Sequence, residues 1–472
     1  MWRFLYNSLL ILVSPIVVCI LLAKPRCRRG FRQRMGLEEG LFGWFRLSGL
    51  SCSKEPDQPN KQDNRNEPGQ PDQPNKPVIW VHAVSLGEAA AVVPLVRELH
   101  NRHPDFRIIV TTVTETGREA VEQRLAGVAE HQYAPLDFPW VVSRTVERLR
   151  PLLYLFVETE LWPNLLWRLH ARGIPAVLVN GRLSSRSFRR QDLPLLRSFY
   201  RSVLQSLALC LMQSARDAQR IVALGAEFSR VHVTGNIKFD QPLPAAQVDS
   251  LLRGSLGVGE REQLILAGST HPGEEELLVS AYGQIVKTHP STVLMLAPRH
   301  IERVDRVEAM VKAAGFIVQR KSQIRAVAAG PRVIILDTRG ELARAYQEAT
   351  VAFVGGTLVP VGGHNLLEPA VWGKPVLFGP YTDHCAEVAT LLHQAGGGYR
   401  VSGPQEIVRY VDEWLVNQGT RDAAGQAARR VVMDNQGALQ RSLQLIESCL
   451  TSSTISTFQS AERSAGSVMA RP

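Results

Sequence analysis

Cysteine is scarce in this 472-residue sequence, which contains six, and no two of them are spaced as CxxC. They are too scattered for a zinc site or a disulfide framework, so a reducing compartment fits best. The net charge of +10 points to an acidic partner. However, the sequence lacks a compact basic block with interleaved aromatics, which argues against nucleic acid.

Charge is absent from Phe4 to Ala23, a stretch long enough to cross a bilayer as a helix. Six cations follow before any acidic residue: Lys24, Arg26, Arg28, Arg29, Arg32 and Arg34. The positive-inside rule predicts a single-pass membrane anchor at 1–23 with the remaining chain on the cytoplasmic face. The same cations would hold the body close to anionic lipids.

Apolar side chains are almost absent between Cys52 and Pro77, where the pentapeptide DQPNK occurs twice. Such a segment cannot bury enough surface to offset the entropy of ordering it. We therefore predict a basic juxtamembrane segment and disordered spacer at 24–76. The Ser/Thr-rich end of the chain, 451–472, is predicted to be a disordered tail.

From Val78 onward, short apolar runs alternate with helical patterns. Runs that are apolar throughout are typical of parallel strands covered by helices on both faces. A proline-containing patch at Asp240–Ala246 interrupts the alternation. We predict an α/β chain with two Rossmann-like domains facing a cleft, at 77–242 and 243–450, and ligands at the carboxyl ends of the strands.

The stretch Val351–Pro380 reads as strand, glycine-rich loop, helix and strand. A helix opening near His364–Asn365 would present free N–H groups to a phosphate. Glu368 could accept hydrogen bonds from sugar hydroxyls. The glycines would let the backbone approach a ligand: Gly355, Gly356, Gly362 and Gly363. An ordinary βα turn is the alternative.

In the first half, three charged residues follow predicted strands. Glu88 lies at a helix start, where the helix dipole favours the ionised form of a base; the alternative is a first-turn acid that improves the helix cap, a common role. Glu158 follows a buried strand and could instead be structural. Lys238 stands at the domain boundary, where a lysine is more often a surface charge.

In the second half, polar residues again end strands. Arg299 is a natural phosphate clamp. The segment Asp337–Glu341 opens a helix after another strand. His271, His300 and His364 do not have the spacing of known metal-ligand motifs, so we interpret them as hydrogen-bonding residues and expect no metal.

Together these stretches resemble the family of 3-deoxy-D-manno-octulosonic acid (Kdo) transferases of lipid A biosynthesis. Ten motifs carry the resemblance in the same order: WVHAVSLGE, TTVTETG, VETELWPN, VNGRLS, GNIKFD, STHPGEEE, APRH, DTRGELARAY, GGTLVPVGGHNLLEPA and LFGP.

The resemblance implies an inverting glycosyltransferase of the GT-B type that moves Kdo from CMP-Kdo to lipid IVA at the inner membrane, without a cofactor. Glu88 would be the general base, and Glu158 and Lys238 would support the transition state. The implied CMP contacts are Pro298, Arg299, Arg339, Gly340, Glu341, Asn365, Leu366, Leu367 and Glu368. Further candidates for the substrate site are Ser269, Thr270, Gly362, Gly363 and His364.

Two departures from the family pattern are the inserted spacer and Arg339, which stands where methionine is usual. One alternative function is a GT-B transferase that uses a UDP-sugar; another is a membrane-tethered nucleotide-sugar or lipid-binding protein without turnover. The arginine-rich stretch Arg182–Arg201 is either a solvated helix face or a patch for membrane or acceptor phosphates. The number of Kdo residues transferred and the acyl pattern accepted stay open.

Overall fold

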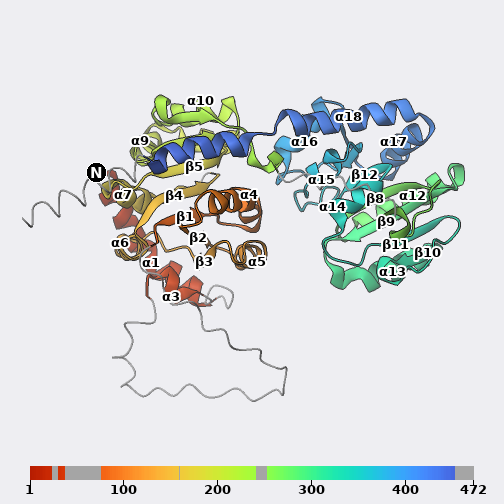
Figure 1. Cartoon of the computed structure of the whole chain (residues 1–472), viewed down its shortest axis with the longest axis horizontal. Helices are drawn as coiled ribbons and strands as arrows, with labels where there is room; N and C mark the ends of the chain where they lie inside the picture. The colour runs from red at the N-terminus through yellow and green to blue at the C-terminus, as the bar shows by residue number, and fades with distance from the viewer. Residues whose placement is uncertain (24–29, 38–75, 159, 241–251, 452–472) are drawn as a thin grey trace, which may run out of the picture. The chain divides into compact units, whose positions relative to one another are not determined.

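The computed structural model describes residues 1–23, 30–37, 76–158, 160–240 and 252–451. The chain forms two compact units (Figure 1). The first unit comprises Met1–Asp240 and Gly437–Pro472, and the second comprises Gln241–Gln436. The predicted tail and most of the predicted spacer lie outside the described residues.

The first unit is built on a parallel sheet of seven strands in the order β3-β2-β1-β4-β5-β6-β7. The strands are β1 (Val78–His82), β2 (Arg107–Thr112), β3 (Glu130–Tyr133), β4 (Pro151–Val157), β5 (Ala176–Gly181), β6 (Leu209–Met212) and β7 (Val231–Val233). The order reverses direction at β1, because β2 and β3 extend to one side and the later strands to the other.

Helices cover both faces of this sheet. They are α4 (Leu86–Arg102), α5 (Glu115–Arg124), α6 (Pro139–Leu149), α7 (Pro163–Ala171), α8 (Ser185–Gln191), α9 (Pro194–Leu204) and α10 (Ala215–Ala223), with the short η2 (Phe228–Arg230) and η3 (Ile237–Asp240). Before the sheet come α1 (Trp2–Ala23) and α3 (Phe31–Arg34).

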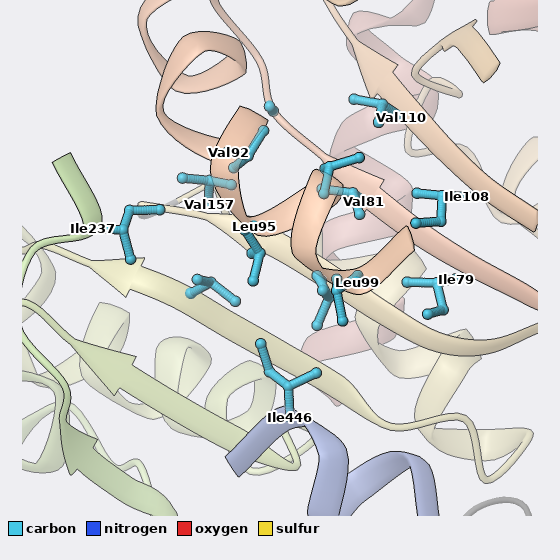
Figure 2. Packing of buried hydrophobic residues seen from close by; sticks show 14 of the residues in the cluster. Ile79, Val81, Val92, Leu95, Leu99, Ile108, Val110, Val157, Ile237 and Ile446 are labelled. Atoms are coloured by element: carbon cyan, nitrogen blue, oxygen red, sulfur yellow. The ribbon is translucent and has the colours of Figure 1, made fainter. Parts of the chain in front are cut away.

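The period-2 alternation of strand side chains divides the core between the two faces. On one face, Ile79 and Val81 pack with Leu95 and Leu99 of α4 (Figure 2). On the other face, Trp80 and the neighbouring strands pack against α6, α7, α9 and α10. The near-continuous apolar runs of the sequence thus arise because both faces are buried.

A helix at 438–451 closes the first of these two cores. Ile446 lies against the sheet beside Leu99 (Figure 2), and Leu443 and Leu450 belong to the same cluster. The Asp240 carboxylate accepts hydrogen bonds from the backbone N–H groups of Gly437 and Leu439, at 2.5 and 2.7 Å. We predicted the second domain to run to residue 450, but its last helical segment packs in the first unit.

The N-terminal helix α1 is attached to this unit. Tyr6 donates a hydrogen bond to the buried Asp137 carboxylate at 2.9 Å, and its ring packs against Trp167 and Phe199. Trp2 also contacts Phe199. Among the described residues, none of the helices is long and apolar enough to cross a membrane. The predicted transmembrane helix is therefore not supported; its first turns carry polar groups that bond to the protein body.

Arg34 also differs from its predicted role as a lipid-facing cation. It is buried, donates a 2.7 Å hydrogen bond to the carbonyl of Val113, and stacks on the Tyr133 ring. Helix α3 thus packs against the edge strand β3. At Arg34, the positive charge of this segment therefore serves a contact within the protein.

The second unit repeats the architecture. Its seven parallel strands have the order β10-β11-β9-β8-β12-β13-β14. They are β8 (Gln263–Thr270), β9 (Thr292–Pro298), β10 (Ile317–Arg320), β11 (Arg332–Ile335), β12 (Val351–Val354), β13 (Val376–Phe378) and β14 (Gly398–Arg400). The direction of the order reverses at β8.

The helices of this unit also cover both faces, with α12, α13 and α17 packing on one of them. The helical elements are α11 (Leu252–Ser255), α12 (Glu274–Thr288), η4 (Ile301–Arg303), α13 (Val304–Ala313), η5 (Lys321–Gln323), α14 (Leu342–Ala345), η6 (Tyr346–Glu348), α15 (Leu367–Val371), α16 (Ala386–Gln394), α17 (Pro404–Val416) and α18 (Gln418–Asp434). The prediction of two parallel-sheet Rossmann-like domains is confirmed.

Truncating a core side chain of helix 438–451 should destabilise the first unit. Ile446 is fully buried, so Ile446→Ala should cost about 2–5 kcal/mol, the usual range for removing a large apolar side chain from a core. Gln444→Ala, at an exposed position of the same helix, is the matched control. Urea unfolding of both variants tests this; equal midpoints would show that the helix adds little to the core.

Candidate active site

The first cluster of candidate residues lies at the carboxyl edge of the first sheet, where the strand order reverses. Ser85 follows β1 and caps α4, and Glu88 occupies the third position of that helix. The Glu88 carboxylate accepts hydrogen bonds from the backbone N–H groups of Val84 (2.5 Å) and Ser85 (3.4 Å). Glu88 is therefore part of a capping box, as the simpler interpretation of the sequence had it.

Glu88 is also placed near other charged side chains, which a helix cap alone does not require. Glu158 follows β4, the strand next to β1, and accepts a 3.0 Å hydrogen bond from the Lys238 ammonium. Its backbone adopts a left-handed conformation with φ of 58°. The structure thus brings together Glu158 and Lys238, which stand far apart in the sequence. The Glu158 charge acts in turn on Glu88.

The pKa of Glu88 differs from our expectation. We expected the helix N-terminus to favour the ionised form, but burial, followed by the charge of Glu158, raises the pKa of Glu88 to about 7. Burial also raises the pKa of Glu160, again with a contribution from Glu158. A carboxylate with a pKa near 7 is well matched to general-base catalysis near neutral pH.

Two asparagines hold this cluster in place, and sequence reasoning missed both. The Asn180 side chain at the end of β5 accepts a 3.1 Å hydrogen bond from the backbone N–H of Ile237. Asn236 accepts one from the N–H of Lys238 at 3.0 Å. Asn180 is fully buried and has a φ of 55°, a conformation that asparagine tolerates better than most residues. Its place at a strand end, within the VNGRLS motif, was the available signal.

The second group of candidates lies at the carboxyl edge of the other sheet. Its members follow four adjacent strands, β11, β9, β8 and β12. Thr270 ends β8 and is buried, and its carbonyl accepts a 3.0 Å hydrogen bond from the N–H of Arg299. Pro298 ends β9, and the Arg299 side chain is exposed. Ser269 has a φ of 55°.

The segment Arg339–Glu341 follows β11 as a turn, with Gly340 at a φ of 84°. The Glu341 carboxylate accepts hydrogen bonds from Lys321, at 2.6 Å, and from the hydroxyl of Thr338. The exposed Arg339 makes a 3.3 Å ion pair with Glu302. The Arg339 and Glu341 side chains of this turn therefore have partners within the protein.

The glycine-rich loop after β12 leads into α15, which starts at Leu367, later than the His364–Asn365 start that we predicted. Leu366 is the residue before the helix, and both leucines are buried. The Asn365 side chain accepts a 3.1 Å hydrogen bond from the N–H of Leu367 and donates to Glu368 at 3.4 Å. The two polar candidates of this loop are thus held next to each other.

Glycine is required at particular points of the loop. A Cβ at Gly355 would stand 2.4 Å from the carbonyl oxygen of Ser269, so the two chain segments can touch only because no side chain intervenes. Gly362 and Gly363 have φ values of 103° and 87°. The glycines therefore serve backbone packing, and the ligand access that we predicted for them stays a prediction.

Glu274, the first residue of α12, organises this edge and was missed by sequence reasoning. Its carboxylate accepts hydrogen bonds from the backbone N–H groups of His271, Gly356, Thr357 and Leu358, at 2.7–3.0 Å. Burial raises the pKa of Glu274, and these four donors oppose that shift. The carboxylate thereby joins the turn after β8 to the glycine-rich loop after β12.

The adjacent Glu275 is also buried. It accepts a hydrogen bond from the Thr270 hydroxyl at 2.9 Å and two from the Arg303 guanidinium, at 2.9 and 3.1 Å. Among the described residues, no group of three or more His, Cys, Asp or Glu side chains is arranged to hold a metal ion.

A polar cavity of about 450 Å³ opens elsewhere in the second unit, and Lys374 lies in its wall. Other lining residues are Gln263, which begins β8, and Thr350, which directly precedes β12. It therefore lies at the amino edge of the sheet and contains none of the candidate residues. The cavity is separate from the candidate active site.

Two Rossmann-like units, with charged and glycine-rich loops at the carboxyl edges of their sheets, are the architecture of the GT-B fold. Solved structures with the same fold include a glycosyltransferase from Rickettsia africae, with a TM-score of 0.53 and 12% identity, covering 80% of this chain and 99% of that one. Another is a putative UDP-N-acetylglucosamine 2-epimerase from Listeria monocytogenes (TM-score 0.52, 17% identity, 79% and 96% coverage).

Sequence comparison identifies the family. Residues 60–241 match the family model described as 3-deoxy-D-manno-octulosonic-acid transferase (kdotransferase). The chain is 33% identical to the 3-deoxy-D-manno-octulosonic acid transferase of Haemophilus influenzae, over 95% of this chain and 98% of that protein. Identity to the Bordetella pertussis transferase of the same name is 35%, over 79% and 87% of the two chains. The chain belongs to the Kdo transferase family, as its motifs indicated.

The pKa of Glu88 predicts how activity depends on pH. If Glu88 is the base, kcat/KM should rise with pH and reach half its plateau near pH 7, because the protonated carboxyl cannot accept a proton. Glu158→Gln removes a charge that raises the pKa of Glu88, so the midpoint should move to lower pH, whatever happens to the plateau. Glu98→Gln, at a half-buried position of α4 where Glu98 pairs with Arg102, is the control. An unmoved midpoint in Glu158→Gln would contradict the coupling.

Glu274→Gln should loosen the carboxyl edge of the second unit. A neutral amide cannot accept from all four N–H donors, so we expect a loss of about 1.5–3 kcal/mol in unfolding free energy. Glu276→Gln, which alters only the exposed capping contact to Gly273 on the same helix, is the matched control. Urea unfolding measures the difference. Equal stability of the two variants would mean that the loop holds its shape without the buried charge.

Proposed function

We propose that this protein transfers Kdo from CMP-Kdo to a hydroxyl group of lipid IVA, with inversion at the anomeric carbon. The observation that carries the proposal is the cluster of Glu88, Glu158 and Lys238 at the point where the strand order of the first sheet reverses. A protein that only binds a nucleotide sugar has no need of a carboxylate with a pKa near 7. Membership of the Kdo transferase family supplies the substrate class.

In this reaction the first unit activates the acceptor. Glu88 takes the proton of the acceptor hydroxyl as its oxygen attacks the anomeric carbon of Kdo. Lys238, held by its 3.0 Å ion pair with Glu158, supplies a fixed positive charge near the reacting groups. Such a preorganised charge stabilises developing negative charge without reorganising during the reaction.

The second unit holds the donor. Arg299 pairs with the phosphate of CMP, and the backbone of the Arg339–Glu341 turn contacts the nucleotide. Asn365 and Glu368 bind the ribose hydroxyls, while Pro298, Leu366 and Leu367 shape the pocket around them. Ser269, Thr270, Gly362, Gly363 and His364 line the same edge. As the bond from the anomeric carbon to the phosphate oxygen breaks, CMP leaves with the electron pair.

We also propose that the first unit binds the anionic surface of the inner membrane on its cytoplasmic face. Helix α1 exposes Phe4, Leu9 and Leu12, and the start of α9 exposes Leu195 and Leu196. Trp2 of α1 contacts Phe199 in the middle of α9. Exposed arginines flank these leucines: Arg186, Arg189, Arg190 and Arg197. Apolar side chains beside cations suit the headgroup region of a bilayer.

Two substitutions separate transfer from nucleotide binding. Glu88→Gln keeps the shape of the side chain but cannot take the proton, so transfer should fall roughly 10²–10⁴-fold while the affinity for CMP stays unchanged. Arg299→Ala should weaken CMP by about 1.5–3 kcal/mol through loss of a charge-assisted hydrogen bond. Matched controls are Glu98→Gln on α4 and Arg306→Ala, an exposed arginine of α13.

The assay combines CMP titration with mass spectrometry of lipid IVA after incubation with CMP-Kdo. Near-normal transfer by Glu88→Gln would show that another residue is the general base, and Glu158 would be the next candidate. Transfer from UDP-sugars and none from CMP-Kdo would favour the other GT-B activity. Binding of CMP-Kdo by the wild-type protein without product would favour a protein that binds but does not turn over.

A further inference from the structure

His271 and His364 form a direct hydrogen bond between their rings. Their Nε2 atoms are 2.8 Å apart, the ring centroids 5.0 Å apart, and the ring planes differ by 6°. Rings stacked face to face stay at van der Waals separation, about 3.5–4.0 Å between carbon atoms. An N–N distance of 2.8 Å between parallel rings therefore means that they meet edge to edge.

Such a pair has a fixed proton count. A neutral imidazole donates from one nitrogen and accepts at the other, so the shared bond needs one ring as donor and the other as acceptor. The neutral pair then presents one Nδ1–H donor. Adding one proton keeps the shared bond and gives both rings an Nδ1–H group, with a single positive charge spread over the pair.

The surroundings of the pair disfavour its protonation in the free protein. Burial and the nearby charges of His300, Arg303 and Arg299 lower the pKa of His271. Burial, then His271 and Arg299, lower the pKa of His364 to about 4, with smaller contributions from His384 and His300. The nearest acid in sequence, Glu274, directs its carboxylate to four backbone N–H groups.

Both Nδ1 atoms are without a hydrogen-bond partner among the described residues, and both rings are half-buried. The cations that lower the proton affinity of the pair also attract an anion. An anion bound beside Arg299 would offset their repulsion and favour the charged form of the pair. Anion binding and proton binding are therefore expected to promote each other.

We propose that the His271–His364 pair takes up one proton from solvent when the phosphate of the cytidine nucleotide binds, and then donates two hydrogen bonds to its oxygens. This inference rests on the proposed function, because it takes that nucleotide as the ligand. The pair becomes a second cation next to Arg299 only while the donor is bound. Protonation would thus be linked to donor binding and reversed on product release.

The test is calorimetric titration of the full chain with cytidine 5′-methylphosphate, whose single phosphodiester charge does not titrate between pH 5.5 and 8.5. Buffers of different ionisation enthalpy give the number of protons taken up. For the wild-type protein we expect uptake approaching about one proton, with affinity rising up to about tenfold per pH unit as the pH falls. The affinity rises as the pH falls because the pKa of the histidine pair is higher in the nucleotide-bound protein than in the free protein.

His271→Gln and His364→Gln keep a polar side chain but cannot take up the proton, so each should abolish the uptake. His289→Gln, which alters a histidine beside Asp412 in the same unit, should leave it intact. A merely structural role would lower affinity equally at all pH values and leave proton uptake unchanged in the variant. That result, or loss of uptake in His300→Gln alone, would overturn the proposal.

Further comparisons show which anionic group of the donor causes the proton uptake and separate this inference from the proposed function. Uptake with CMP-Kdo but not with the methyl ester would assign the pair to the sugar carboxylate and overturn its assignment to the phosphate. Binding of the ester without any proton uptake, in a protein that transfers Kdo, would overturn this inference and leave the proposed function standing. A wild-type protein that neither binds the ester nor transfers Kdo would overturn both.

Discussion

The carboxylate of Glu274 is the contact on which the candidate donor site depends. It is fully buried, and four backbone N–H groups from two separate loops converge on it. Without a shared acceptor these N–H groups would be left unpaired, at a cost of about 1–3 kcal/mol each when buried. One carboxyl side chain thus fixes both the turn that carries His271 and the loop that carries His364.

The first unit uses a different device for the same purpose. Its charged residues are positioned by side chains at strand ends, where Glu158 and Asn180 adopt left-handed backbone conformations. Such conformations turn the chain sharply away from the strand and occur where surrounding contacts impose them. Lys238 is then fixed by Glu158 through its side chain and by Asn236 through its backbone. In both units, the candidate site residues lie beside the strand at which the order of the sheet reverses direction.

The sequence predicted the two parallel sheets because fully apolar strands and intervening helices are local patterns. It also located the candidate residues at strand ends, because the motifs follow the apolar runs directly. It did not reveal Glu274, since an acidic residue at a helix start is usually a cap, nor the return of helix 438–451 to the first unit. The burial of Arg34 and the docking of Tyr6 on Asp137 were missed for the same reason: each depends on partners about 80–130 residues away.

The return of the chain at Gly437 has a consequence for biosynthesis. The second unit is inserted within the first, and Asp240 binds the start of the helix that completes the first core. During translation, domains form as units in the order in which their residues emerge. From this order of synthesis we expect the second unit to fold while the earlier-made sheet still exposes the apolar surface that Leu443 and Ile446 will cover. The unit that begins the chain would then be the last to finish folding.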